Sequence, residues 1–273
     1  MKVAFIKLIS SIFITALLMT SCLGDSDNSY QIDRTFAYVT NVDGVKVACT
    51  DIGYVNSAVG MENMMDGQCY FVGFKITNTN SSTGIYSAEY MNVLDDGAID
   101  QSRLSDGKPY YNIDPITQND STQISAMRVA AYYPAKELYN DRWLLSFSVP
   151  NMYEDDEVDV YFYYDPTNQV NEKGETIGIS DNKIVIDVKF IKIEGSGSGT
   201  SRTKEYFYVG NLSSMRSYEP KYNEKGTAGV AVKFRYTIVK SGETTPILEY
   251  FPKGDVAWDG DGNNAYILYY NKN

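Results

Sequence analysis

The stretch EVDVYFYY at residues 157–164 decides the fold class, because its side chains alternate strictly between two kinds. One set is apolar and would share one face: Val158, Val160, Phe162 and Tyr164. The other set, Asp159, Tyr161 and Tyr163, would share the opposite face. A period of two is that of a β-strand, and one buried face with one wet or half-wet face is typical of antiparallel sheets.

The same pattern extends outward along the chain. KIVIDVKFIKI at 183–193 alternates in the same way, and runs rich in β-branched and aromatic residues are separated by Gly, Asn, Asp and Ser. These runs predict strands at 34–40, 45–50, 68–77, 85–94, 127–133, 142–149, 203–209, 229–239 and 265–270. Asn41-Val42-Asp43-Gly44 has the composition of a hairpin turn. The sequence therefore predicts an all-β protein built as an antiparallel sandwich or barrel.

The domain organisation is predicted from a break at PAKELYND, residues 134–141. Proline ends the strand before it, and a short turn can follow. This gives an N-terminal β domain at 30–135 and a C-terminal β-sandwich domain at 136–273, with one larger sandwich as the alternative. The Gly- and Ser-rich segment 195–201 is predicted as a surface loop within a domain.

The first 21 residues have the organisation of a lipoprotein signal peptide. Lys2 and Lys7 precede a twelve-residue apolar run at 8–19, which is shorter than the about 20 apolar residues that span a bilayer. Thr20 and Ser21 are small, and Cys22 follows them directly, although Met19 stands where leucine is usual. We expect Cys22 to be lipidated after cleavage; the alternative is an ordinary secretory signal followed by an incidental cysteine.

Residues 22–29 are acidic and polar, as expected of a flexible tether. We therefore predict attachment to the outer membrane through the N-terminal lipid. Acidic residues directly after the cysteine resemble the export signals of Bacteroidota surface lipoproteins, which implies exposure at the cell surface; a periplasm-facing position is the alternative.

Composition excludes several functions. Removing residues 1–21 takes away two lysines and no acid, so the formal charge changes from −11 to −13. A mature chain with this much negative charge repels the phosphates of nucleic acids, so we do not expect nucleic acid as a partner. The chain has no histidine, which excludes Ser-His-Asp and Cys-His catalysis and histidine-containing metal sites. No Walker loop, GxSxG or HExxH motif is present, so we predict neither an enzyme nor a bound cofactor.

Cys49 and Cys69 remain once Cys22 carries lipid. Each lies in a predicted strand, and outside the cytosol a disulfide between them is permitted. The alternative is two buried thiols that pack as small apolar side chains.

Two acidic segments are weak metal candidates. Asp259, Asp261 and Asn263 have the alternating oxygen ligands of a calcium loop, but the sixth position lacks glycine and the twelfth lacks glutamate. A hairpin turn explains this segment better. The run Glu154–Glu157 is interpreted as a solvated loop that protects a sheet edge. We therefore predict no metal site.

The 24 tyrosines are the remaining unusual feature. A tyrosine offers a flat apolar ring with a polar tip, which suits sugar rings and protein interfaces. Most are expected to be ordinary strand residues. Tyr161 and Tyr163 are predicted on the wet face of their strand and form the candidate binding face.

The segment SCLGDSDNSY, residues 21–30, resembles the start of Bacteroidota surface lipoproteins, notably the NigD-like group. That resemblance implies an OB-like N-terminal β domain followed by a β-sandwich, with a poorly defined function. Fimbrillin-like pilins are the alternative resemblance, and they would need processing near Arg34. The hypotheses are thus a non-catalytic lipoprotein that binds a protein or glycan, a pilus or assembly subunit, and a carboxylate-dependent glycan hydrolase.

Overall fold

The computed structural model describes residues 29–78, 84–106, 123–124, 128–132, 139–193, 195–238, 247–254 and 266–272. Strands dominate these residues, and the helical turns among them are short 3-10 segments at Met61–Asn63, Ile179–Asp181 and Ser213–Ser217. The predicted all-β class is confirmed. Nowhere in the described part of the chain is a helix long and apolar enough to cross a membrane.

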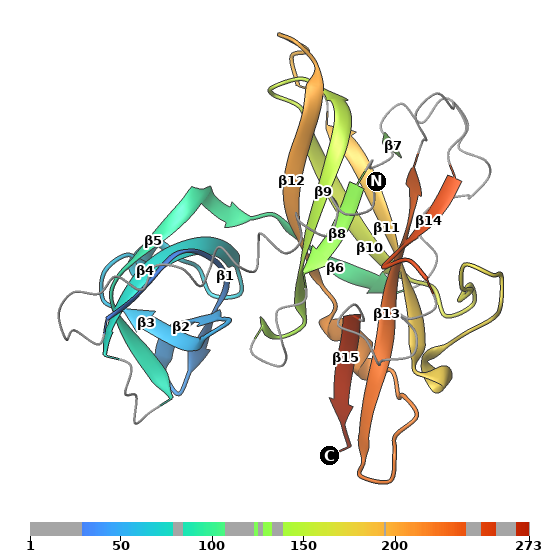
Figure 1. Ribbon diagram of the computed structural model, residues 1–273, viewed down its shortest axis with the longest axis horizontal. Helices are drawn as coiled ribbons and strands as arrows, with labels where there is room; N and C mark the ends of the chain where they lie inside the picture. The colour runs from blue at the N-terminus through green and yellow to red at the C-terminus, as the bar shows by residue number, and fades with distance from the viewer. Residues whose placement is uncertain are drawn as a thin grey trace, which may run out of the picture. The chain divides into compact units, whose positions relative to one another are not determined.

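The first unit is a closed barrel, drawn in blue to cyan in Figure 1. Its strands are β1 (Tyr30–Val42), β2 (Val45–Thr50), β3 (Gly53–Ser57), β4 (Cys69–Asn78) and β5 (Ile85–Ile99). They close in the order β1-β2-β3-β5-β4, with β3 parallel to β5. This is the OB-like arrangement that was predicted for the N-terminal domain. The interior is filled by apolar side chains that include Val39, Ala48, Val55, Val72 and Met91.

Two local features shape the barrel. The predicted turn between β1 and β2 is present, with positive φ angles of 51° at Asp43 and 83° at Gly44. A bulge interrupts the pairing of β1 with β4 between Ile32 and Thr35. A Cβ on Gly73, which faces this bulge, would lie 2.6 Å from the carbonyl oxygen of Asp33. Only glycine therefore lets the bulge approach β4.

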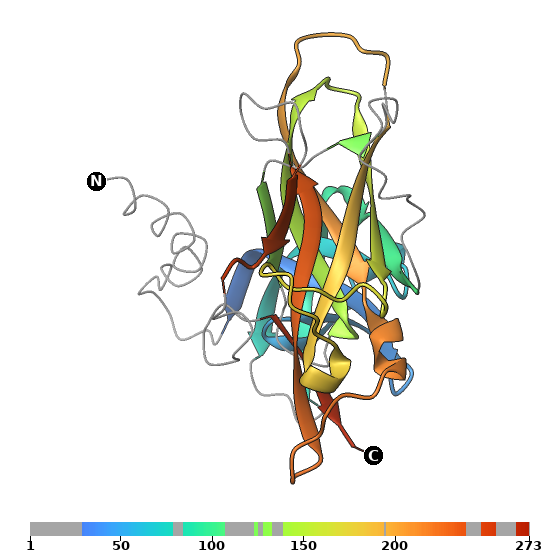
Figure 2. The ribbon, with the colours of Figure 1, turned by 90° about the vertical axis from the view of Figure 1, so that its right-hand side faces the viewer.

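The second unit is a sheet that curls into two layers (Figures 1 and 2). Its order is β14-β13-β11-β10-β6-β12-β9-β8, with β15 paired to β13 and β7 paired to β11. The strands are β6 (Gln101–Asp106), β7 (Gln123–Ile124), β8 (Arg128–Tyr132), β9 (Arg142–Met152), β10 (Glu157–Tyr164), β11 (Lys183–Ile193), β12 (Arg202–Asn211), β13 (Thr227–Ile238), β14 (Ile247–Phe251) and β15 (Tyr266–Asn271). Strand β6 joins the layers, because it is parallel to β10 at one side and to β12 at the other.

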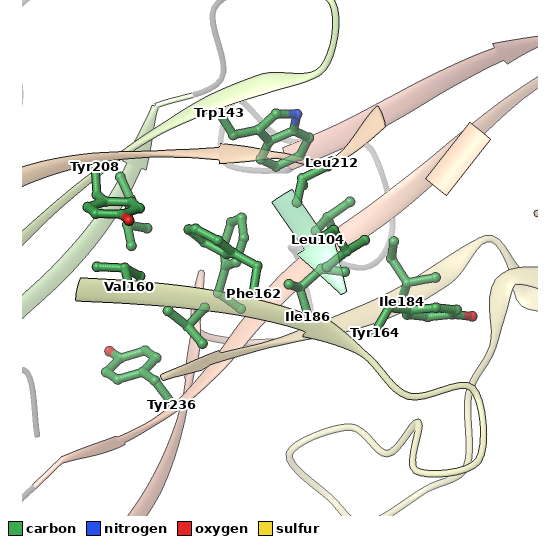
Figure 3. Packing of buried hydrophobic residues seen from close by; sticks show 14 of the residues in the cluster. Leu104, Trp143, Val160, Phe162, Tyr164, Ile184, Ile186, Tyr208, Leu212 and Tyr236 are labelled. Atoms are coloured by element: carbon green, nitrogen blue, oxygen red, sulfur yellow. The ribbon is translucent and has the colours of Figure 1, made fainter. Parts of the chain in front are cut away.

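The core of the second unit lies between these layers. Phe147 of β9 meets Phe190 of β11 with ring centroids 4.6 Å apart, and Trp143 meets Phe234 of β13 at 5.7 Å. Figure 3 shows Phe162 of the β10 layer pointing toward the opposite layer. The predicted C-terminal β-sandwich is therefore observed, and Trp143 is buried in its core.

The boundary between the units differs from the predicted one. The described chain divides at Gly97 and Ala98, upstream of the break expected at 134–141. The physical reason is β6, which contributes Leu104 to the sandwich core and hydrogen-bonds to strands of the second unit. The strands β6, β7 and β8 therefore belong with the sandwich, because pairing partners assign a strand to a domain more strongly than a nearby proline does.

Candidate ligand-binding face

The outer face of β10 carries the predicted tyrosines, as the alternation requires. Val158, Val160, Phe162 and Tyr164 are buried in the core. Tyr161 points outward and is 39% exposed, and Tyr163 is half-buried beside it. We name the surface formed by Asp159, Tyr161, Tyr163 and Lys189 the tyrosine face. Two residues along a strand span about 7 Å, so the two rings are adjacent.

Neighbouring strands complete this face with charges of both signs. In the register of β10 and β11, Lys189 lies opposite Tyr161, and Asp187 lies opposite Tyr163. The hydroxyl of Tyr161 donates to a carboxylate oxygen of Asp159 at 3.3 Å. The face therefore offers flat rings bordered by hydrogen-bonding groups.

Both phenols are held in the neutral form. Partial burial raises the pKa of Tyr161, and the negative charge of Asp159 raises it further. Burial also raises the pKa of Tyr163. A neutral phenol can stack and hydrogen-bond, but it does not act as a base near neutral pH.

Farther along the same outer face, a loop at 165–182 covers the sheet. The side-chain amide of Gln169 bonds to both backbone groups of Val185: it donates to the oxygen at 3.0 Å and accepts from the nitrogen at 2.7 Å. The backbone oxygen of Val170 accepts a hydrogen bond from the Tyr250 hydroxyl at 3.2 Å. Val185 and Ala231 form a small apolar cluster of their own, with Ile177 and Tyr250 packed against it.

Buried charges under this loop are paired. Asp187 receives two hydrogen bonds from Arg235, one of them 2.7 Å long, and Arg235 also donates to the backbone oxygen of Asn168 at 3.2 Å. Burial raises the pKa of Asp187, and the Arg235 guanidinium opposes that rise. Lys233 is fully buried and pairs with Glu172. These charges hold the loop to the sheet, so the Tyr161 end of the face is the part that stays open.

The acidic run Glu154–Glu157 has a structural use. Asp156 is 1% exposed and accepts hydrogen bonds from the backbone nitrogens of Tyr153 at 2.7 Å and Gly195 at 3.0 Å. It also pairs with Lys192 at 2.8 Å. These contacts, led by Lys192, lower the pKa of Asp156 to about 2. The carboxylate ties the β9–β10 turn to the loop that follows β11.

Of the two alternatives for the cysteines, a disulfide and two buried thiols, the structure has the second, and the reason is strand order. Cys49 of β2 and Cys69 of β4 both lie opposite Tyr38 of β1, but on its two different sides. Two strand spacings put their Cα atoms about 10 Å apart, whereas a disulfide needs less than about 7 Å. Both cysteines are buried and unbridged. Burial raises the pKa of the Cys49 thiol to about 12, which makes it unreactive.

Arg34 lies inside β1, which begins at Tyr30, four residues before the predicted strand. It pairs with Asp95 and lies over the ring of Phe71, 4.0 Å from its centroid. Cleavage after Arg34 would remove Tyr30–Ile32, one of the two parts of β1 that pair with β4.

Several parts of the predictions lie outside the described residues: the signal peptide, Cys22, the tether up to Asn28, and the weak metal candidates Asp259, Asp261 and Asn263. Among the residues that are described, no three His, Cys, Asp or Glu side chains come together as a metal site.

Sequence reasoning missed the covering loop and its charged partners. A signal was present, because Lys233 and Arg235 occupy alternate positions in an otherwise apolar strand. That spacing places both on one outer face. Their burial depends on a loop some 60 residues earlier in the chain, and pairing over that separation is not visible in one strand.

Comparisons with known proteins show a similarity of fold to solved structures. No family model matches the chain, and no curated protein matches it by sequence. An uncharacterised protein from Parabacteroides merdae has a TM-score of 0.55 at 11% identity, covering 87% of this chain and 98% of that one. A protein from Bacteroides fragilis, described as a candidate lipoprotein, has a TM-score of 0.51 at 8% identity, covering 82% of this chain and 96% of that one. The chain is therefore similar along most of its length to solved structures of Bacteroides and Parabacteroides proteins, and at these identities the similarity is one of fold.

Proposed function

We propose that this chain is a lipid-anchored protein of the bacterial outer membrane that binds a protein or glycan ligand and catalyses no reaction. The body is held outside the cytosol by Cys22, and the acidic tether after it directs the protein to the cell surface. The observation that carries the binding role is the tyrosine face, where Tyr161 keeps 39% of its surface exposed on an ordered strand.

The proposed lipid anchor is supported by the first 22 residues and by the description of a protein with a similar fold. A charged start, a twelve-residue apolar run and small residues before Cys22 are the parts of a lipoprotein signal. The Bacteroides fragilis neighbour is itself described as a candidate lipoprotein. A barrel followed by a sandwich is also the order implied by the resemblance to the NigD-like group.

The non-catalytic role is supported by the state of the titratable groups near the face. The Tyr161 and Tyr163 phenols have raised pKa values and are neutral. Asp187 is bonded to Arg235, and Asp165 accepts hydrogen bonds from the backbone nitrogen and the hydroxyl of Thr167. Groups bound in this way orient a loop and a sheet, and they suit ligand binding better than proton transfer.

The binding role is tested by screening purified residues 23–273, which lack the signal peptide and the lipid-bearing cysteine, against a glycan array and a panel of envelope proteins. We expect a ligand whose dissociation constant rises about tenfold in Tyr161→Ala, equivalent to about 1.4 kcal/mol. The matched control is Phe207→Ala, which removes an equally exposed aromatic ring from β12, in the other layer. Absence of any ligand, or an equal loss in the control, contradicts the proposal.

The anchor is tested separately in cells of the native host. An alkyne-labelled palmitate should be incorporated into the wild-type protein and not into Cys22→Ser. Release of an unacylated mature protein into the medium would disprove the anchor while leaving the binding measurement unaffected.

A further inference from the structure

One end of the barrel presents ordered apolar side chains to solvent. The turn Asp43–Gly44 and the connection Ala58–Gln68 meet there, because β2 begins and β3 ends at the same level. Lys46 donates to the backbone oxygen of Met64 at 2.7 Å, and Gly67 donates to the oxygen of Val39 at 2.8 Å. We name this end, residues 43–45 and 58–68, the barrel tip.

The connection in the barrel tip is held firmly. Met61 and Met64 are buried in the barrel interior. The backbone nitrogen of Met65 donates to the Tyr70 hydroxyl at 2.9 Å, and the nitrogen of Met91 donates to the oxygen of Val59 at 2.9 Å. Two methionines thus point inward, and the residues beside them are fixed in an outward position.

The outward residues are large and apolar. Met65 is 62% exposed and Val59 is 58% exposed, the highest values among the large hydrophobic side chains that the structure describes as exposed. Val45, on the adjoining turn, is 40% exposed. Exposed apolar side chains are unfavourable in water. Because the backbone that carries them is already held firmly, little conformational entropy is lost when a partner covers them.

The exposed charged side chains of the barrel tip are all acidic. Asp43, Glu62 and Asp66 are exposed at the tip. Lys46, which adjoins the tip in β2, is basic, and its amine donates a hydrogen bond to the backbone oxygen of Met64. A partner that places an apolar side chain on Met65 therefore gains most when cations flank that side chain.

We propose that the barrel tip is a second binding surface, separate from the tyrosine face, for a protein segment that carries apolar side chains flanked by lysine or arginine. The apolar contact is made with Met65 and Val59, and the flanking cations meet Asp66 and Glu62. This inference does not depend on the ligand of the tyrosine face, because the two surfaces lie on different units.

The test uses residues 23–273 and two synthetic amphipathic peptides, one of leucine and lysine and one of leucine and glutamate. Binding is followed by fluorescence anisotropy at low and high ionic strength. We expect the lysine peptide to bind more tightly than the glutamate peptide, and its dissociation constant to rise at least about tenfold in the double variant Val59→Gln, Met65→Gln. Asp66→Asn with Glu62→Gln should reduce the salt dependence.

The control is Leu248→Gln, since Leu248 is 53% exposed on β14 in the other unit. It should leave the binding unchanged, and circular dichroism should show that all variants stay folded. The proposal is overturned if neither peptide binds, if Leu248→Gln has the same effect, or if both peptides bind equally. It is also overturned if Met65 proves to mediate self-association, or binding to neutral lipid vesicles in place of the peptide.

Discussion

At the scale of single residues, Asp156 shows how burial changes the meaning of a charge pattern. A run of four acids is normally solvated, yet Asp156 is buried while its neighbours Asp155 and Glu157 are exposed. It is stabilised by Lys192 and by two backbone nitrogens. The sequence predicted a solvated loop here, and it could not show which of the four carboxylates turns inward, because Lys192 and Gly195 lie nearly 40 residues later.

The pH dependence of stability follows from this residue. The pKa of Asp156 is about 2 in the folded protein and about 3.9 in an unfolded chain. Because the folded value is the lower one, its stabilising contribution is complete above about pH 4 and is lost as the pH falls toward 2. We expect the urea midpoint of Asp156→Asn to be lower than wild type at pH 7 and to change less between pH 4 and pH 2.

Glu154→Gln is the control, since Glu154 is exposed in the same run. Its stability profile should follow that of wild type. An unchanged acid profile in Asp156→Asn would show that other groups are responsible.

At the scale of elements, alternation was the reliable signal. It predicted β10 and β11 and the face on which each side chain lies, including Tyr161 outside. It missed β6, because QSRLSD contains a single core residue, Leu104, and it missed β3, which is five residues long. Those strands are defined by the partners on both sides, and pairing over long sequence separation is not encoded in the local pattern.

Close contact between β12 and β10 gives a prediction at this scale. A Cβ on Gly210 would lie 3.0 to 3.2 Å from the ring of Phe162, so Gly210→Ala should force the layers apart. We expect a loss of about 1–3 kcal/mol in the free energy of unfolding, the usual range for overpacking a core. Urea unfolding followed by tryptophan fluorescence measures it, because both tryptophans belong to residues 98–273.

Gly178→Ala is the matched control, since Gly178 is also extended and its nearest neighbour would be 3.7 Å away. Its unfolding curve should overlay that of wild type. Equal losses in the two variants would mean that glycine replacement itself, and not the Phe162 ring, is the cause.

At the scale of the whole molecule, the sequence correctly predicted two β bodies and misplaced their border. The composition of residues 134–141 and the proline at their start predicted the border there, but the chain divides between Gly97 and Ala98. A border is defined by which strands exchange hydrogen bonds, and the strands paired with β6 among the described residues, β10 and β12, both belong to the sandwich.

Fragments test this border. Residues 98–273 should unfold cooperatively with a near-ultraviolet circular dichroism signal, whereas residues 136–273 should lack both. The shorter fragment loses β6, and with it the link between β10 and β12 and the hydrogen bond from the Ser102 hydroxyl to the Val160 oxygen at 2.6 Å. A cooperatively folded 136–273 fragment would disprove the assignment of β6 to the sandwich.

The place of β6 in the sheet also makes its folding depend on a partner that is distant in sequence. β6 is complete at Asp106, but one of its two neighbours begins only at Arg202. Until that neighbour is present, one edge of β6 has unpaired backbone groups, and such an edge can pair with another chain. A body that folds outside the cytosol, as we propose, therefore needs this edge protected until β12 has been exported.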